Sequence, residues 1–235
     1  MAKMESEDTN WVIEELPSFV AIQHIFRLLR AIISNIQVVI SSWQHAIYTV
    51  NPSMSPSNSN NTLTTPLNKG HEAMAYLTYI IDNYASLPSI MAFIHPHRSG
   101  FLSAWHTDTP LHSNVDALTT LQISFVEQNG YANLRCNWNP GCLAKHTANA
   151  HVTKEVWHDI FSGTSTDKGE THEAPSHVGA ACCAQFVASR SRVMERPLSD
   201  YEHFRQWIID TEMTDAKSGR VFEFLWHVIF GMQPI

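Results

Sequence analysis

Two histidines in this chain stand where general base chemistry is expected. His95 and His97 follow the apolar run 90–94, which is typical of a short interior strand. Side chains at the end of such a strand reach the ligand site in α/β proteins, and an imidazole titrates near neutral pH. Either histidine could therefore act as a general base, and we expect His95 to do so. A His-x-His pair also suits a metal ion, but the sequence offers no obvious third ligand, and we predict no metal site.

The adjacent cysteines Cys182 and Cys183 are candidate nucleophiles, together with Ser189. A thiolate is the better nucleophile where a neighbouring group lowers its pKa. Both cysteines fall inside residues 180–188, which we expect to form a buried strand, so only one of them can face a given side of the sheet. We take Cys183 as the candidate. The alternative is that both are small apolar residues that fill the core of this strand.

The remaining cysteines, Cys136 and Cys142, are followed by His146. The spacing C-x5-C-x3-H is conceivable for zinc but matches no common zinc module, which favours ordinary buried thiols. Adjacent cysteines such as Cys182 and Cys183 are awkward for a disulfide framework, and no cleavable signal sequence is evident at the start. We therefore expect a reducing, cytoplasmic location.

The elements that must position these groups alternate between helices and strands. Residues 68–84 combine a glycine turn with apolar residues at steps of three and four, which predicts a helix with Glu72 in its first turn. Residues 19–40 also show helical spacing, but polar residues recur through them, so they make a poor membrane span. The alternation predicts an α/β fold with a mostly parallel or mixed sheet flanked by helices. We expect further helices at 13–16, 117–126, 154–161, 201–211 and 220–230, strands at 46–50, 89–94, 131–136 and 180–188, and loops at 51–66, 137–151 and 162–177.

The composition sets the class of protein. The chain has 235 residues, of which 44% are hydrophobic and 16% charged, and this suits one globular domain over residues 1–235. The formal net charge of −7 argues against a broadly basic nucleic-acid face, although a local basic groove is compatible with it. We expect no membrane contact.

Several blocks of the sequence follow the order found in one protein family. On these blocks the chain resembles an uncharacterised fungal domain family, over roughly residues 43–231 together with residues 7–18. The blocks include Asn68-Lys69-Gly70 with Glu72 and the following YLTYIIDNY, Phe93-Ile94-His95-Pro96-His97, Gly130 to Cys136, Cys182-Cys183-Ala184-Gln185-Phe186, and Ser218-Gly219-Arg220 followed by Phe222-Glu223.

This resemblance implies a fold and a function. The last of these blocks, towards the C-terminus, are similar to those of nucleotide-sugar glycosyltransferases. This similarity implies a single Rossmann-like, glycosyltransferase-A-like domain. Some fungal members resemble arginine-containing cyclodipeptide synthases, which use aminoacyl-tRNAs to make cyclo-arginine-Xaa diketopiperazines in secondary metabolism. We therefore expect such a synthase, with arginyl-tRNA and a second aminoacyl-tRNA as substrates and no cofactor. The alternatives are a nucleotide-sugar-dependent glycosyltransferase and a non-catalytic member of the same family.

The chain departs from the family pattern at two points. Residues 19–42 are interposed where the family sequence continues from Ser18 directly to Trp43, as a translated intron would be. At the start, Met1-Ala2-Lys3 resembles the tail of a truncated first strand. Sequencing the transcript tests the first point, because a message that retains these codons contradicts the intron hypothesis.

A metal-dependent glycosyltransferase needs an Asp-x-Asp pair for the cation that bridges the leaving diphosphate. The chain has none, because Asp82 and Asp108 are isolated. Basic residues would have to replace the metal, and the candidates are Lys69, Arg98 and Arg135. This counts against the glycosyltransferase.

Cyclodipeptide synthesis makes different demands. An aminoacyl ester on tRNA is already activated, so the absence of a G-x-x-x-x-G-K-[ST] loop is compatible with it. The reaction needs a nucleophile or a positioned amine, a general base and an oxyanion stabiliser. An arginine substrate also calls for a carboxylate that binds the guanidinium through two oxygens, and Glu72, Glu223 and Asp108 are candidates. Glu72 alternatively suits the dipole of its helix, and Glu223 lies in an apolar run where a buried carboxylate must be paired or functional.

The basic and aromatic residues could hold the tRNA end. Lys69 and Arg135 are candidates for phosphate contacts, and Trp105, Trp138 and Tyr131 for stacking on adenine, although each also suits a core or rim position. The catalytic candidates are thus Glu72, His95, Cys183 and Glu223, and the substrate-binding candidates are Asn68, Lys69, His97, Trp105, Asp108, Arg135 and Gln185.

Overall fold

The computed structural model describes residues 2–4 (backbone only), 8–16, 43–50, 63–101, 107–135, 151–165 and 174–234. The predictions for residues 19–42, for most of the 51–66 loop and for Trp105, Cys136, Trp138, Cys142 and His146 lie outside these ranges.

The strands form two small sheets. The first has the order β1-β2-β3 and is parallel, with Ala2 opposite Tyr48 and Tyr48 opposite Leu63. The second has the order β4-β6-β5 and is antiparallel, with Phe93 and Asn133 both opposite Phe186. The expected α/β class is therefore confirmed, with parallel and antiparallel pairings. The strands are β1 (Ala2–Met4), β2 (Tyr48–Val50), β3 (Leu63–Thr64), β4 (Ile90–Phe93), β5 (Tyr131–Asn133) and β6 (Phe186–Ser189).

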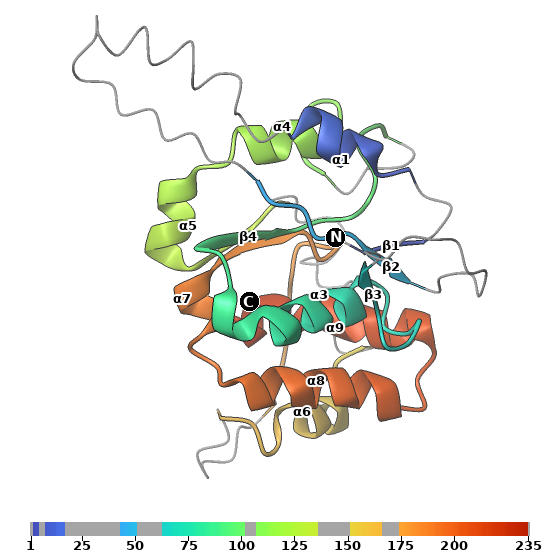
Figure 1. Ribbon diagram of the computed structural model, residues 1–235. Coiled ribbons are helices and arrows are strands. Elements are labelled where there is room, and N and C mark those ends of the chain that lie inside the picture. The colour runs from blue at the N-terminus through green and yellow to red at the C-terminus, as the bar shows by residue number, and fades with distance from the viewer. Residues whose placement is uncertain are drawn as a thin grey trace, which may run out of the picture.

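The helices lie on both sides of β4 (Figure 1). On one side are α1 (Asn10–Glu15) and α4 (Asn114–Thr119), and on the other are α3 (Glu72–Asn83) and α9 (Asp215–Ile229). Beyond α3 and α9 lie α8 (Leu198–Asp210) and α6 (Lys154–Phe161). The remaining helices are η1 (Tyr84–Ser86), α5 (Ile123–Asn129) and α7 (Arg190–Val193). No helix in the described ranges has the length and apolar character needed to cross a membrane.

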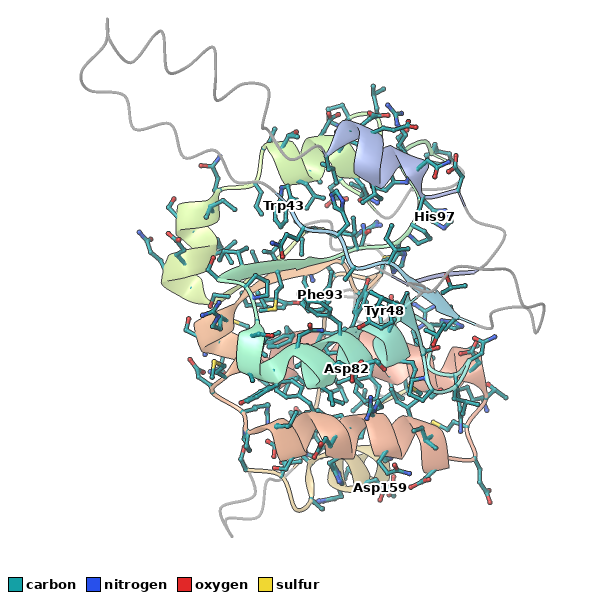
Figure 2. All side chains as sticks on the ribbon, viewed as in Figure 1. Trp43, Tyr48, Asp82, Phe93, His97 and Asp159 are labelled. Carbon is teal, nitrogen blue, oxygen red and sulfur yellow. A yellow bond between two sulfur atoms is a disulfide. The ribbon has the colours of Figure 1, made fainter. Side chains whose placement is uncertain are left out.

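An aromatic cluster holds α3 and α9 against the second sheet. The rings of Phe93 and Phe186 stack with centroids 4.9 Å apart, and Tyr76 lies 5.0 Å from Phe93. Trp226 of α9 lies 5.3 Å from Phe186, and all four side chains are buried. Phe93 lies between β4 and α3 (Figure 2). Each such aromatic pair contributes roughly 0.5–1.5 kcal/mol beyond the area that it buries.

The turn that begins α3 depends on a glycine. Gly70 has a φ of 78°, a region that glycine occupies without strain. A β-carbon at Gly70 would also lie 2.7 Å from Cγ2 of Ile208 on α8. The turn before α3 can therefore lie this close to α8 only because Gly70 has no side chain. This turn fixes where α3 starts and hence where Glu72 stands.

Several predicted elements are wrong in extent. The strand expected at 131–136 ends at Asn133, and the helices expected at 13–16, 201–211 and 220–230 begin earlier, at Asn10, Leu198 and Asp215. The single helix expected at 117–126 is two helices, because Ser113 accepts a hydrogen bond from the Asp116 amide and starts α4 early, and the Thr120 hydroxyl bonds back to the Asp116 carbonyl where α4 ends. The strand expected at 180–188 begins only at Phe186. The loop expected at 51–66 contains β3 near its end.

Candidate functional site

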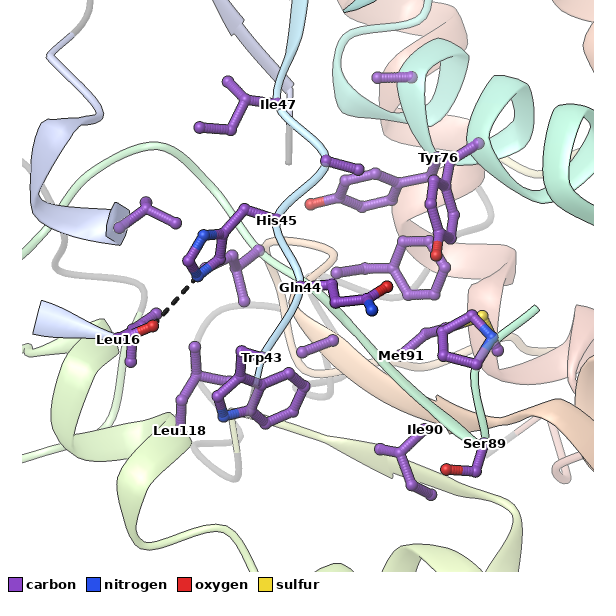
Figure 3. A pocket seen from close by; sticks show the side chains of 18 of the residues that line it. Leu16, Trp43, Gln44, His45, Ile47, Tyr76, Ser89, Ile90, Met91 and Leu118 are labelled. Atoms are coloured by element: carbon purple, nitrogen blue, oxygen red, sulfur yellow. Dashed lines mark hydrogen bonds between the residues drawn. The ribbon is translucent and has the colours of Figure 1, made fainter. Parts of the chain in front are cut away.

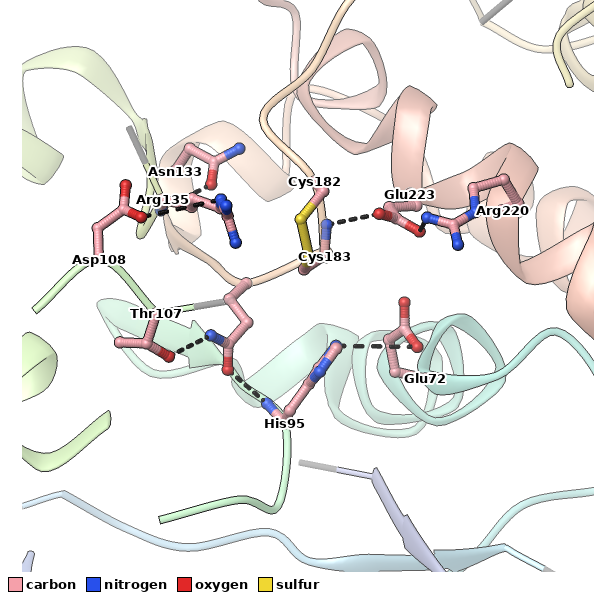
Figure 4. The surroundings of a disulfide bond; sticks show 11 residues. Glu72, His95, Thr107, Asp108, Asn133, Arg135, Cys182, Cys183, Arg220 and Glu223 are labelled. Carbon is pink, nitrogen blue, oxygen red and sulfur yellow. Dashed lines mark hydrogen bonds and ion pairs between the residues drawn. A yellow bond between two sulfur atoms is a disulfide. The ribbon is translucent and has the colours of Figure 1, made fainter. Parts of the chain in front are cut away.

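Four segments that are far apart in the sequence bring polar side chains together (Figure 4). Glu72 opens α3, and His95 follows β4 by two residues. Cys182 and Cys183 lie in the bend before β6, and Glu223 lies on α9. All four catalytic candidates therefore belong to one cluster (Figure 4).

The starts of α3 and α9 are held together directly. The His71 amide donates to Oδ1 of Asp215 at 2.9 Å, and the His71 ring Nε2 lies 3.2 Å from Oδ2. Gly219 of α9 packs on the same ring, where a β-carbon would lie 2.8 Å from Cγ of His71. This contact brings α9, and with it Glu223, against the first turn of α3.

Glu72 and His95 form the centre of the cluster. Oε2 of Glu72 lies 3.9 Å from Nε2 of His95, and the two side chains are 14% and 19% exposed. Burial raises the pKa of Glu72 to about 8, and the nearby carboxylate of Glu223 adds to the rise. Glu72 is consequently mostly protonated at neutral pH, so that a proton donor stands beside a histidine.

Gln185 holds the His95 loop by a hydrogen bond to its backbone. Its Oε1 accepts the His95 amide hydrogen at 2.8 Å, and its Nε2 donates to Oγ1 of Thr107 at 3.1 Å. The Gln185 side chain is almost fully buried. Gln185 was predicted to bind substrate, which stays a prediction, and in this structure its amide has these two protein partners.

Glu223 is held at both oxygens. Its Oε1 accepts the Cys183 amide hydrogen at 2.6 Å, and its Oε2 accepts a hydrogen bond from Arg220 Nη1 at 2.6 Å. The side chain is 12% exposed. The expectation that a buried Glu223 must be paired or functional is met by these bonds, which tie the cysteine bend to α9.

Cys182 and Cys183 form a disulfide between neighbouring residues. Cys183 and Ala184 both have positive φ angles, 86° and 46°, which interrupts extended backbone and delays the start of β6. The predictions that the pair lies in a strand, one cysteine to each face, and that both are thiols are therefore wrong for this structure. Cys183 can act as a nucleophile only after the disulfide is reduced.

Three side chains of the cluster are close enough together to be considered as ligands of one metal ion. Sγ of Cys182, Sγ of Cys183 and a carboxylate oxygen of Glu223 all lie within 4.8 Å of one another. Thiolates, and not disulfide sulfurs, are the ligands that zinc takes from cysteine. Only the reduced form could therefore use this set.

Asp108 and Arg135 pair with each other across the cysteine bend from Glu223 (Figure 4). Oδ1 of Asp108 lies 3.8 Å from Nε of Arg135, and the side chains are 29% and 4% exposed. The Arg135 amide donates to Oδ1 of Asn133 at 3.0 Å. Two of the substrate-binding candidates thus belong to the cluster as an ion pair.

Other candidates lie apart from the cluster or outside the described residues. Lys69 donates from Nζ to the Ile209 carbonyl at 3.2 Å and to the Thr211 carbonyl, so it caps the end of α8. Asn68 is exposed in the turn before α3. The His97 carbonyl accepts a hydrogen bond from Asn114 Nδ2 at 2.7 Å, and Trp105 is not described.

The sequence predictions missed Arg220, Thr107 and Asn133, which also belong to the cluster. Arg220 stands three positions before Glu223, a helical spacing that could have suggested their ion pair. Thr107 carries no such signal, since its contact with Gln185 spans 78 positions of the chain.

Comparisons with known proteins place the chain in a family. Its whole length, residues 1–235, matches the family described as "Protein of unknown function (DUF3431)". No curated protein matches the chain significantly. No solved structure does so either.

Proposed function

We propose that this chain, which belongs to the DUF3431 family, is an aminoacyl-tRNA-dependent cyclodipeptide synthase that forms a cyclo-arginine-Xaa product. The proposal is carried by one observation, the partly buried Glu72 carboxyl whose Oε2 lies 3.9 Å from Nε2 of His95, in a cluster at the end of β4. Burial raises the pKa of this carboxyl to about 8, which suits it to act as the acid. An acid and a base side by side are what two successive acyl transfers from ribose esters require.

The first transfer needs one proton to be removed from the attacking amine and one to be given to the leaving ribose oxygen. The α-amino group of one aminoacyl-tRNA attacks the ester carbonyl of the other, so that a C–N bond forms and the C–O bond to the ribose breaks. His95 accepts the amine proton, and Glu72 protonates the departing ribose oxygen. A proton passed from His95 to Glu72 then restores both groups.

The second transfer repeats this chemistry within the dipeptidyl-tRNA and closes the six-membered ring. Both esters are already activated, so neither step consumes ATP. In the disulfide form, Cys183 takes no part as a nucleophile, and the amine attacks the ester directly.

Asp108 is our choice for the guanidinium of the arginyl group. Its side chain is 29% exposed, whereas those of Glu72 and Glu223 are 14% and 12% exposed, so a substrate reaches Asp108 most easily. Glu223 already binds Arg220 and the Cys183 amide. Asp108 pairs with Arg135 through Oδ1, so a substrate guanidinium that binds both oxygens of Asp108 would take the place of this contact.

The proposal extends to the fold, to a single Rossmann-like, glycosyltransferase-A-like domain that works in the cytoplasm, where charged tRNAs are available. It is supported by the parallel order β1-β2-β3 and by the position of the cluster beyond the end of β4. The same strand order favours a second candidate, a nucleotide-sugar-dependent glycosyltransferase, although the chain has no Asp-x-Asp pair.

Expression in yeast followed by mass spectrometry of the extracts tests the proposal. Two versions are compared, the chain as given and one that joins Ser18 to Trp43, each beside its Glu72→Gln variant. A new arginine diketopiperazine that disappears with Glu72→Gln supports the synthase. Soluble, folded protein without such a product in either version contradicts it. Turnover of a nucleotide-sugar with manganese would then favour the glycosyltransferase.

A further inference from the structure

Three side chains of the kinds that bind zinc meet at the cysteine bend, residues 182–184. Sγ of Cys182, Sγ of Cys183 and a carboxylate oxygen of Glu223 lie within 4.8 Å of one another. Ligand atoms around one tetrahedral zinc ion lie roughly 3.5–4 Å apart, because the Zn–S and Zn–O distances are about 2.3 and 2.1 Å. The three groups therefore form a set of the right size once the two sulfurs are no longer bonded to each other.

The shape of the bend turns both sulfurs toward one side. In an extended strand, adjacent side chains point to opposite faces and are badly placed to bind the same ion. Here Cys183 and Ala184 have φ angles of 86° and 46°, and both sulfurs lie near Glu223. The Cys183 amide is bonded to Glu223, and the buried Gln185 side chain is bonded at both ends. Because none of these bonds involves sulfur, we expect the bend to persist when the disulfide is reduced.

Glu223 is already oriented by its own partners. Its Oε2 accepts a hydrogen bond from Arg220 Nη1 at 2.6 Å, and its side chain is 12% exposed. Carboxylates that bind metal ions are typically held by hydrogen bonds of this kind. Each carboxylate oxygen has two lone pairs, so Oε1 can bind an ion and still accept the Cys183 amide hydrogen.

The charges of the set suit a divalent ion. Two thiolates and the Glu223 carboxylate carry three negative charges, which one Zn²⁺ ion and the Arg220 guanidinium neutralise. Cys182 is buried, and a buried thiolate without a compensating cation is costly. Thiolate ligands also favour zinc over magnesium and calcium, which bind oxygen.

Among the described residues, a cavity of about 300 Å³ elsewhere in the fold offers no comparable set (Figure 3). It lies between residues 43–47 and β4, and its lining is mostly apolar. The His, Cys, Asp and Glu side chains in this lining are His45 and Glu127, and His45 Nε2 is already hydrogen-bonded to the Leu16 carbonyl at 3.2 Å. Within the described ranges, the cysteine bend is where three such side chains converge.

We propose that the reduced form of this chain binds one zinc ion through Cys182, Cys183 and Glu223. The disulfide opens when a dithiol gives it two electrons and two protons and is itself oxidised to a disulfide. Zinc then displaces the two thiol protons and binds the thiolates. Water takes the fourth position, as in other zinc sites with three protein ligands.

The ion takes over a link that reduction removes. In the disulfide form, the two sulfurs are joined to each other, and Glu223 reaches the bend through the Cys183 amide. In the zinc form, both sulfurs and Glu223 are joined through the metal, which ties the bend to α9 more firmly. The proposal is independent of the proposed enzymatic activity.

The test uses the purified chain with Cys136→Ser and Cys142→Ser, so that Cys182 and Cys183 are its only cysteines. It is reduced with a phosphine, which carries no thiol to compete for the metal. We expect equimolar zinc to slow iodoacetamide labelling of both cysteines roughly tenfold or more, and EDTA to restore it. Cobalt(II) in place of zinc should give a thiolate-to-cobalt charge-transfer band, and magnesium should have neither effect.

Two variants of this chain identify the ligands. Glu223→Gln should weaken zinc binding roughly tenfold or more, whereas Glu202→Gln, at an exposed position of α8, should leave it unchanged. Cys182→Ser should lose both zinc binding and most of the cobalt band, and it tests the site even if Glu223→Gln does not fold.

Three results would overturn the proposal. One is labelling of the reduced, folded chain that zinc does not slow. The second is equal zinc affinity in folded Glu223→Gln and Glu202→Gln, and the third is protection by magnesium as strong as that by zinc. Because none of these readouts uses turnover, an inactive protein does not affect the test.

Discussion

Oε2 of Glu72 lies 3.9 Å from Nε2 of His95, although the two residues come from the start of a helix and from the loop after a strand. The pair is partly buried, and burial raises the pKa of the carboxyl to about 8. A carboxyl that is protonated at neutral pH beside an imidazole is a pairing that can both take and give a proton.

Glu72 should make stability depend on pH. Its pKa is about 8 when folded against an ordinary value of 4.5, so the folded state binds the extra proton between these values. The stability that it contributes is complete below about pH 4.5 and is lost as the pH rises through about 8. We therefore compare the free energies of unfolding of Glu72→Gln and of the unchanged chain in urea. As the pH rises from 5 to 8.5, this free energy should increase in Glu72→Gln by roughly 2–4 kcal/mol relative to the unchanged chain. Glu202→Gln, at an exposed position of α8, is the control and should show no such trend.

Removing the base should stop turnover while the fold persists. We expect His95→Ala to lower the rate of diketopiperazine formation by roughly 10²–10⁴-fold, the usual contribution of general base catalysis. His158→Ala removes an exposed histidine from α6 and should leave the rate unchanged. Circular dichroism spectra would check that both variants are folded. A folded His95→Ala protein with full activity would remove this residue from the site.

Gln185 should act through the His95 loop. Gln185→Leu loses the bond from the His95 amide and the bond to Thr107, which we expect to cost about 1–3 kcal/mol of stability. If Gln185 positions His95, the variant should lower kcat and shift the pH profile of kcat with little change in KM. A large rise in KM with an unchanged profile would instead support direct substrate binding by Gln185.

The state of the cysteine pair can be measured by alkylation. Before reduction, iodoacetamide should label neither Cys182 nor Cys183, and after reduction it should label both, as read by peptide mass spectrometry. Direct attack by the amine predicts that Cys183→Ser retains turnover in the presence of reductant. Loss of turnover in Cys183→Ser, with Cys182→Ser active, would show that the thiolate forms an acyl intermediate.

Lys69 should matter for stability and not for turnover. Lys69→Met keeps the length of the side chain and removes the bonds to the Ile209 and Thr211 carbonyls at the end of α8. We expect a loss of about 0.5–1.5 kcal/mol in chemical unfolding and an unchanged KM for both tRNAs. A KM that rises several-fold at unchanged stability would return Lys69 to the tRNA-binding surface.

Helices with strong local signals could be predicted well. Thr153 caps α6 by accepting a hydrogen bond from the Val156 amide, and α6 has the predicted bounds, 154–161. The apolar steps Met74, Leu77 and Ile80 identified the buried face of α3. These features depend on neighbours within a few positions, so the sequence carries them directly.

The cysteine bend could not be predicted in the same way. Residues 180–188 are apolar enough to suggest a continuous strand, but the disulfide and the bond from the Cys183 amide to Glu223 bend the chain before Phe186. That bond joins positions 40 apart. The partners of Gln185 are likewise distant, and only the folded chain shows that it holds the His95 loop.

The most direct test of the central claim uses purified protein with arginyl-tRNA and a mixture of other aminoacyl-tRNAs, followed by mass spectrometry. The account predicts a cyclo-arginine-Xaa product that requires intact tRNA, is lost on RNase treatment, and is absent with Glu72→Gln and His95→Ala but present with His158→Ala. Folded protein that leaves the charged tRNAs unchanged under these conditions, or a product that survives RNase treatment, would contradict it.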